Sequence, residues 1–463
     1  MEGSSEIVTS EPTISARERE ALSRSPIKKL ENPYRKFIRN EAVSGVILVL
    51  SIFIALVWGN LSSTYEHIWE AELTFEFEKI KFQTNLHFLI NEFLMTAFFL
   101  LVGLEIKREL LFGELRNFRV AILPLFGAIG GMVVPVLLYA SINPPGSPYF
   151  KGWAIPMATD IAFALGILYM MGNRVPHSLK IFLASLAIFD DLGSIMVIAI
   201  FYSKGIEVEY LLLSAIFILL LFLLNKFNLR VLRIYFLIGF GLWISLYLAG
   251  VHPTLAGVII ALFIPEQQHL DFIEFEEIGF QLLNKMDNYL KDNELKKYEV
   301  EPFMDTIQTL RIACDEVLSP LQRLEYNLSP MVTFYIIPLF VFANAGISFT
   351  RSFAERIIKP VALGVITGLV FGKPLGIFLF SQIPLKLKWA SLPRSMTVGH
   401  LFSAGLIGGI GFTMSTFILT LTFTDHEIIE STKIAILMAS FIAAVLGMVS
   451  IKFLDKKNKK TRD

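Results

Sequence analysis

The chain contains twelve apolar runs, most of them close to the length at which an α-helix crosses a lipid bilayer. A helix needs about 20 mainly apolar residues to cover a hydrocarbon core roughly 30 Å thick. The composition agrees, because 54% of the 463 residues are hydrophobic and only 18% are charged, whereas soluble domains carry about 25% charged residues. We therefore predict one all-α polytopic membrane protein with twelve transmembrane helices. The expected spans cover residues 44–62, 85–106, 120–142, 153–171, 179–203, 208–225, 232–250, 252–265, 331–349, 357–381, 399–423 and 430–452.

The basic residues set the expected orientation. They gather before the first span and after the second, fourth, sixth, tenth and twelfth spans, all on one side of the predicted bundle. The positive-inside rule then puts both termini in the cytoplasm. The expected domains are a cytoplasmic N-terminal extension (1–40), spans one to eight (41–265), a cytoplasmic acidic helical insert (266–329), spans nine to twelve (330–453) and a basic cytoplasmic tail (454–463).

Charge and cysteine content exclude some functions and partners. The formal net charge is zero, so no bulk electrostatic argument supports nucleic acid as a partner. The single cysteine, Cys314, excludes an intrachain disulfide. Residues 1–40 contain no apolar segment that resembles a signal peptide, so we expect the first span to target the chain.

Two stretches outside the spans have their own patterns. Residues 70–84, in the first outer loop, alternate apolar and polar side chains, which indicates either a short β-hairpin or an ordinary loop. The acidic stretch 266–329 has apolar residues near helical spacing. It is interpreted as two amphipathic helices, with a solvated spacer as the alternative.

Three aspartates, Asp160, Asp190 and Asp191, lie inside apolar runs that hold no other charge. A charged residue at the bilayer centre costs roughly 2.5–3.5 kcal/mol on insertion scales, so an intramembrane carboxylate usually faces a water-filled path and handles ions or protons. Such a carboxylate binds Na⁺ through oxygen, while burial favours its protonated form. Na⁺ and H⁺ therefore compete for one group, which is sufficient for exchange when the site opens alternately to the two sides. Because helix neighbours point about 100° apart, Asp190 and Asp191 are expected to have different roles.

Two spans carry signals of an interrupted helix. Thr159 and Asp160 follow Pro156, and the eleventh span contains the glycine-rich stretch 405–414. Helix ends that face each other at the midplane need compensating charge. Asp160 could neutralise the positive helix ends. Lys373, in the tenth span, could pair with the negative helix ends or with an aspartate. Spans three to five and ten to twelve start on opposite sides, each with an interrupted helix in the middle. This inverted repeat predicts an ion site near the midplane.

Each of these groups also has a purely structural interpretation. Asp160 alone could simply cap a helix break, and Lys373 could be a lysine that snorkels from a helix end. His252 is more often a turn or cap residue than a proton carrier. Glu105, Arg108 and Glu109 share one helical face at the cytoplasmic end of the second span. This pattern fits either ordinary ion pairing at a helix end or a pH-sensing cluster.

Six sequence strings, in this order and spacing, resemble those of NhaA-type sodium/proton antiporters, and the resemblance runs from about residue 35 to 453. The strings are 158–166 (Ala-Thr-Asp-Ile-Ala-Phe-Ala-Leu-Gly), 188–193 (Ile-Phe-Asp-Asp-Leu-Gly), 250–258 (Gly-Val-His-Pro-Thr-Leu-Ala-Gly-Val), 340–346 (Phe-Val-Phe-Ala-Asn-Ala-Gly), 372–376 (Gly-Lys-Pro-Leu-Gly) and 408–415 (Gly-Gly-Ile-Gly-Phe-Thr-Met-Ser).

The resemblance implies a twelve-helix fold with crossed, broken fourth and eleventh helices in a bacterial inner membrane. It implies electrogenic exchange of cytoplasmic Na⁺ or Li⁺ for more than one external H⁺, no cofactor, and a homodimer through the outer hairpin. By position, Asp191 resembles the main cation ligand, and Asp190 the proton carrier that pairs with Lys373 when cation is absent. Thr159 and Asp160 match the broken-helix positions of the cation site. The pH-response positions are Glu105, Arg108, Glu109 and Glu325, to which we add His252 as a candidate.

Two departures from the family pattern limit the transfer. The link after the eighth span is much longer here, so the insert inherits no role. Tyr326 and Ser329 stand where some members carry histidines near Glu325, so the transferred pH response is not assured.

Two other classes are kept as alternatives to a transporter, an intramembrane aspartyl protease and a cation channel. The protease would want one aspartate in a Gly-x-Gly-Asp setting, which neither aspartate motif has. A channel would need a continuous pore filter rather than an inverted repeat. A metal-dependent prenyl transferase would want an Asp-Asp-x-x-Asp cluster, but the sequence from Asp190 to Ser194 stops after two aspartates.

Overall fold

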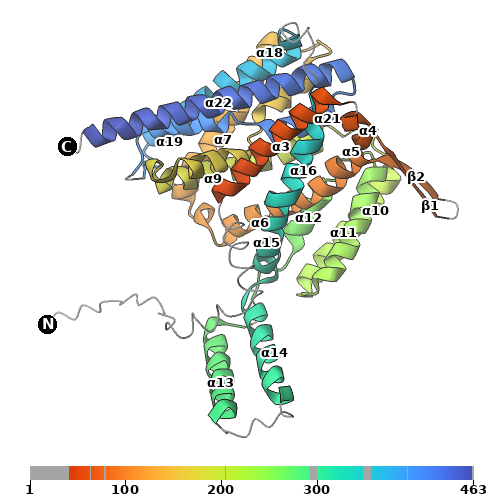
Figure 1. Ribbon diagram of the computed structural model, residues 1–463, viewed down its shortest axis with the longest axis vertical. Coiled ribbons are helices and arrows are strands. Elements are labelled where there is room, and N and C mark those ends of the chain that lie inside the picture. Colours follow the sequence, from red (N-terminus) through yellow and green to blue (C-terminus); the bar gives the residue numbers. More distant parts are fainter. Residues whose placement is uncertain are drawn as a thin grey trace.

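The computed structural model describes residues 41–460 except 63, 78–79, 204, 269, 292–299, 348–355 and 394. The predicted N-terminal extension (1–40) and the last three residues of the predicted tail lie outside this part. Within it, nine helices are long and apolar enough to cross a membrane, and ten when the bent pair α20 and α21 is counted as one span. The chain is thus an all-α polytopic membrane protein, with long helices packed side by side (Figure 1).

The elements up to the insert are mostly helical. They are α3 (Glu41–Leu61), α4 (Thr64–Trp69), β1 (Glu72–Phe77), β2 (Ile80–Asn85), α5 (Leu86–Phe88), η1 (Leu89–Leu94), α6 (Met95–Leu111), η2 (Glu114–Arg116), α7 (Phe118–Ile142), η3 (Phe150–Met157), α8 (Ile161–Met170), η4 (Gly172–Arg174), α9 (His177–Phe201), α10 (Val208–Lys226), α11 (Leu232–Leu248) and α12 (Leu255–Phe263).

The second half begins with the two helices of the insert, α13 and α14. Its elements are α13 (Phe272–Lys291), α14 (Val300–Val317), α15 (Pro320–Met331), η5 (Val332–Ile336), α16 (Ile337–Asn344), α18 (Pro360–Thr367), η6 (Gly368–Gly372), α19 (Lys373–Lys386), α20 (Val398–Gly408), α21 (Phe412–Thr422) and α22 (His426–Lys460).

Two features project from the bundle in Figure 1. Strands β1 and β2 pair antiparallel, with Glu72 opposite Asn85 and Phe77 opposite Ile80. Helices α13 and α14 pack against each other and extend away from the other helices. The hairpin and the insert therefore present surfaces beyond the helical bundle.

The expected and observed spans differ most near the insert. The hydropathy pattern places the start of the ninth span at 331, but helix begins at Pro320 and continues through α15, η5 and α16 to Asn344. The side chain of Ser319 accepts from the Gln322 amide, the Gln322 side chain accepts from the Ser319 amide, and Pro320 occupies the first turn. This capping box starts the helix well before its apolar part. Glu325 therefore belongs to the start of the ninth span rather than to the insert.

The predicted eighth span is also shorter than expected. The turn at Gly250 has a left-handed φ of 76°, and α12 contains only nine residues, whereas α11 contains 17. Both are shorter than the roughly 20 residues that cross a bilayer, so the count of twelve stays a prediction.

Helices α7 and α19 run antiparallel in direct backbone contact. A Cβ atom on Gly130 would lie 2.1 Å from the carbonyl oxygen of Gly376, and one on Gly376 would lie 2.0 Å from the carbonyl oxygen of Gly130. Only glycine leaves room for this approach. The contact fixes α19, and with it Lys373, against α7.

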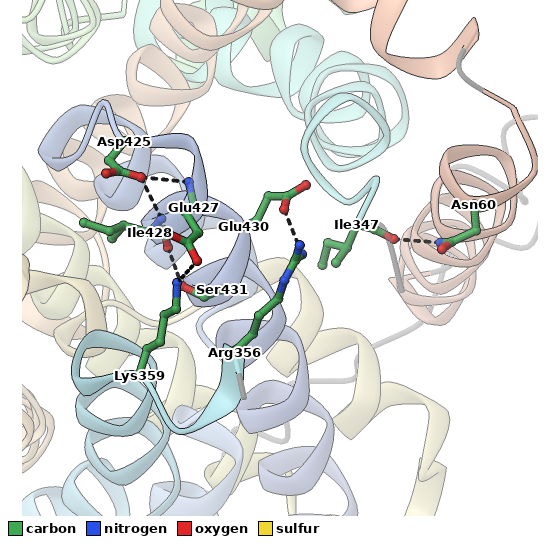
Figure 2. A network of polar contacts seen from close by, with 9 residues as sticks. All are labelled: Asn60, Ile347, Arg356, Lys359, Asp425, Glu427, Ile428, Glu430 and Ser431. Carbon is green, nitrogen blue, oxygen red and sulfur yellow. Dashed lines mark hydrogen bonds and ion pairs between the residues drawn. The ribbon is translucent and has the colours of Figure 1, made fainter. Parts of the chain in front are cut away.

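Ion pairs join α22 to the chain that leads into α18 (Figure 2). Arg356 Nη1 lies 2.8 Å from Glu430 Oε2, and both side chains are mostly buried. Lys359 forms a second ion pair with Glu427. In the same region Asn60, at the end of α3, donates to the carbonyl oxygen of Ile347 at 2.7 Å. These contacts tie three segments that are far apart in the sequence.

Candidate functional site

The two interrupted spans meet where their helices break. In the first, the 3₁₀ helix η3 ends at Met157, an extended stretch follows, and α8 begins at Ile161. In the second, α20 and α21 are bent by 44° across a short break. The backbone amide of Asp160 donates to the carbonyl oxygen of Ile410 at 2.7 Å. The breaks thus satisfy part of each other's exposed backbone, as a non-helical segment inside a membrane protein requires.

Asp160 compensates the starts of two helices at once. Its Oδ1 accepts from the Phe163 amide of α8 at 3.0 Å, and its Oδ2 accepts from the Thr413 amide of α21 at 3.1 Å. The side chain is only 2% exposed. Because helix N-termini carry unpaired N–H groups and a partial positive charge, one carboxylate stabilises both.

Lys373 and Asp190 form a fully buried ion pair. Lys373 Nζ lies 2.7 Å from Asp190 Oδ2, and both side chains are 0% exposed. Lys373 follows the π-helical turn η6 and precedes Pro374, which has no amide to donate. A π turn is a local irregularity common at functional sites, and here it lies immediately before the lysine.

The opposite helix ends receive hydrogen-bond donors. Lys373 Nζ also donates to the carbonyl oxygen of Met157, the last residue of η3. The Thr159 hydroxyl lies 3.0 Å from the carbonyl oxygen of Gly408, the last residue of α20, and 2.6 Å from Asp190 Oδ2. Both C-terminal helix ends at the break thus meet a donor, and Thr159 and Lys373 converge on one carboxylate oxygen.

Two other carboxylate oxygens of α9, one on each aspartate, lack hydrogen-bond partners. Among the described residues, Asp190 Oδ1 and Asp191 Oδ1 are buried without one, as is the hydroxyl of Ser194. Buried polar atoms are normally satisfied, so each exception needs an explanation. Ser194 lies one turn after both aspartates, so the three residues form a small group of oxygen donors suited to a hard monovalent cation.

The structure groups the charged residues at the end of α6 around Arg108. Its Nη2 lies 2.9 Å from Glu109 Oε1. Its Nε lies 3.0 Å from Glu325 Oε1, close enough for an ion pair although the N–H direction does not give a hydrogen bond. Glu105 interacts electrostatically with this group and also with Asp191. The second and ninth spans therefore share a charge cluster around Arg108.

His252 is not part of this cluster. It lies in the turn before α12, and its Nε2 is 3.0 Å from the carbonyl oxygen of Tyr202, just after α9. The far end of α12 is the one near the cluster, since Lys107 donates to the carbonyl oxygens of Leu262 and Ile264. The structure thus separates His252 from the other pH-response candidates.

Some polar groups inside the bundle were not among the predicted site residues. Ser194 is one, and the hydroxyl of Ser415, which donates to the carbonyl oxygen of Ile155 at 2.7 Å, is another. A third is a buried amide group in which Asn344 Nδ2 donates to Asn91 Oδ1 at 2.9 Å and Asn344 Oδ1 lies 3.1 Å from His87 Nε2. A polar residue at an inward position of an apolar run is the signal that could have found them.

The arrangement suits transient ion binding. Among the residues that the structure describes, no group of three or more His, Cys, Asp and Glu side chains could hold a metal ion. Instead, two carboxylates with free oxygens lie beside a lysine that neutralises one of them. Buried ionisable groups at crossed, interrupted spans are typical of ion-coupled secondary transporters, and this is the class that the fold and site define.

Comparison with known proteins gives the family. Residues 35–451 match the model of the family described as Na+/H+ antiporter 1. A Na(+)/H(+) antiporter NhaA from Koribacter versatilis is 42% identical over 426 residues, covering 92% of each chain. The NhaA proteins of Helicobacter pylori strain 26695 (41% identical, 93% of this chain and 98% of theirs) and Sulfurimonas denitrificans (40%, 93% and 97%) are similar to the same extent.

The chain belongs to the Na⁺/H⁺ antiporter 1 family, which contains the NhaA antiporters. It is therefore a bacterial membrane antiporter with Na⁺ and H⁺ as substrates, and it is a transporter rather than an enzyme. The aspartyl protease alternative is not favoured.

Proposed function

We propose that the protein exchanges cytoplasmic Na⁺ or Li⁺ for external H⁺ at the buried group formed by Asp190, Asp191 and Lys373. The single observation that carries this proposal is the buried Lys373–Asp190 ion pair beside two carboxylate oxygens without hydrogen-bond partners. In the proton-loaded state Asp191 is protonated and Asp190 is paired with protonated Lys373. The site then carries no net charge.

Cation binding displaces protons from this site. Na⁺ binds between the two carboxylates, with Thr159 and Asp160 shaping the site, and Asp191 loses its proton. The positive charge of Na⁺ competes with the Lys373 ammonium for Asp190, so the pair gives up a second proton. One Na⁺ thus replaces two H⁺, and the loaded site carries one net negative charge. Exchange by this scheme is electrogenic, since unequal charge crosses in the two directions.

The cluster around Arg108 supports pH regulation in this proposal. Glu105, Glu109 and Glu325 surround one arginine at the cytoplasmic end of α6 and α15. Protonation of these carboxylates changes the charge near the inward path of the cation.

The proposal also includes the location and assembly of the protein. Both termini lie in the cytoplasm, the protein occupies the inner membrane, and two copies associate through β1 and β2.

The site is tested in everted vesicles that hold a pH gradient. Added Na⁺ or Li⁺ should dissipate the gradient in the wild type at some pH between about 6 and 9, the range in which buried carboxylates and lysines titrate. Asp191→Asn should abolish this response, whereas Asp271→Asn, outside the membrane before α13, should not. A wild-type response in Asp191→Asn would refute the assignment.

The proton stoichiometry is tested separately with Lys373→Ala. Loss of the lysine removes one of the two proton sites, so Na⁺ recognition should persist while charge movement on a solid-supported membrane falls. Unchanged charge movement per Na⁺ would show that the Lys373–Asp190 pair carries no transported proton.

A further inference from the structure

A large groove lies away from the ion site, between the starts of α7 and α9 and the end of α19. We call it the α7–α9–α19 groove. Its volume is 1360 Å³, and its lining is mostly apolar and aromatic. Phe126 and Trp389 meet edge to face with ring centroids 6.2 Å apart. Phe118 and Trp389 are 68% and 53% exposed, so the groove opens to its surroundings, which for this part of the bundle are the bilayer and its surface.

The groove lies apart from the buried aspartates. On α9 it is lined by Ser178, Ile181, Phe182 and Ser185, which share one helical face. At about 100° per residue, Asp190 is rotated about 140° around the helix axis from Ser185, and Asp191 about 120° in the opposite direction. The groove and the ion site thus occupy different sides of α9.

The rim of the groove is basic. Arg119, in the first turn of α7, and Lys388, just after α19, both line it, with Glu114 as the acidic residue. Asn117 caps α7, and the positive end of this 25-residue helix also faces the rim, because Phe118, Arg119 and Val120 belong to the lining. The summed charge favours an anion.

Lys388 occupies a backbone position that normally favours glycine. Its φ is 57°, and the following amide of Trp389 donates to the carbonyl oxygen of Pro384 at 2.9 Å, which closes the end of α19. Helices that end in this way usually have glycine or asparagine at the left-handed position. The helix end itself does not require a lysine at this position. We therefore infer that the Lys388 side chain has a separate role.

We propose that the α7–α9–α19 groove binds an anionic phospholipid of the leaflet on the side to which the basic residues assign the cytoplasm. The acyl chains lie against the apolar lining, the phosphate is held by Arg119 and Lys388, and Trp389 lies at the level of the headgroups. Basic pockets between membrane helices on the cytoplasmic side recognise such lipids, and tryptophan is enriched at this depth. The apolar lining and the volume suit acyl chains rather than a free phosphate ion.

The test compares lipids on the purified full-length protein. Thermal stability and native mass spectrometry are measured with phosphatidylglycerol, phosphatidylcholine and inorganic phosphate. The wild type should retain phosphatidylglycerol preferentially and gain stability from it. Arg119→Gln and Lys388→Gly should each weaken this preference about fivefold, the effect of one basic side chain near an anionic surface. Lys388→Gly also relieves the left-handed backbone, so its stability without lipid should not fall.

Lys386→Gln is the matched control, because Lys386 lies two residues earlier in the last turn of α19 and is not part of the lining. It should keep the wild-type lipid preference. Equal retention of both lipids by the wild type, full preference in the double variant R119Q/K388G, or stabilisation by inorganic phosphate equal to that by the lipid would each overturn the proposal. None of these outcomes depends on transport activity.

Discussion

The contact between Gly130 and Gly376 predicts that one added methyl group disrupts the ion site from a distance. In Gly376→Ala the new Cβ would lie 2.0 Å from the carbonyl oxygen of Gly130, whereas ordinary contact begins at 3.4 Å. The obstacle is backbone, so no side-chain rotation relieves it. The two helices must separate locally by about 1.4 Å, the difference between these distances.

This separation moves Lys373, one helical turn before Gly376. Its hydrogen bond to Asp190 is 2.7 Å long, and a shift of about 1 Å exceeds the range in which an N–H···O bond persists. Overpacking of this kind costs about 1–3 kcal/mol of stability, and misplacing a functional group by 1 Å can cost on the order of 100-fold in rate. We expect Gly376→Ala to lower the initial rate of Na⁺-driven proton movement by about 10- to 100-fold.

The rate is measured by dequenching of a pH-sensitive dye in everted vesicles, with expression measured in parallel. Stability is measured by thermal unfolding of the purified protein. Gly279→Ala is the control, because a Cβ at Gly279 in α13 meets no atom within 4 Å and alanine is the better helix former. Wild-type rate and wild-type unfolding temperature in Gly376→Ala would refute the argument that this backbone contact positions Lys373.

Three further substitutions test individual contacts. Thr159→Val removes the hydroxyl whose single proton is shared between Asp190 and the end of α20, so the apparent Na⁺ affinity measured by dequenching should change about 5- to 10-fold, in line with the roughly 1 kcal/mol of a typical hydrogen bond. An unchanged affinity would contradict the role. Asp160→Asn leaves a single acceptor oxygen for two helix starts, so unfolding of the purified protein should be easier by about 0.5–2 kcal/mol, with wild-type stability as the contrary result. Arg108→Gln removes the positive charge that forms ion pairs with Glu109 and Glu325. Because a nearby positive charge favours the charged form of an acid, the pH–activity profile should move in the alkaline direction, whereas an acid shift would show that the ion pairs have another role.

Much of the bundle follows from hydropathy alone, because long apolar runs have few stable alternatives in lipid. Pro156 and the glycines of 405–414 also mark the two breaks, since these residues weaken helices in any context. The start of the ninth span is different. It depends on the capping box at Ser319, whose effect extends helix into polar sequence where hydropathy gives no signal.

The geometry of the site is harder to predict. Lys373 and Asp190 are 183 residues apart in sequence, and no periodicity within either span shows which aspartate the lysine reaches. The partners of Thr159 and Asp160 depend on how the two breaks cross, which is a tertiary property. Helix periodicity indicates that Asp190 and Asp191 differ, but the free Oδ1 atoms follow only from the packed structure.

The crossing of the breaks restricts how the protein can move. The Asp160 amide is bonded to Ile410, its carboxylate to Thr413, and the Thr159 hydroxyl to Gly408, so three hydrogen bonds join the two interrupted spans within a few residues of each other. One span cannot slide or rotate past the other without breaking all three bonds in a region that offers little water to replace them. In the exchange proposed above, the pair would therefore move as one rigid unit, and opening the site to either side would require the surrounding helices and this unit to move relative to each other as whole bodies.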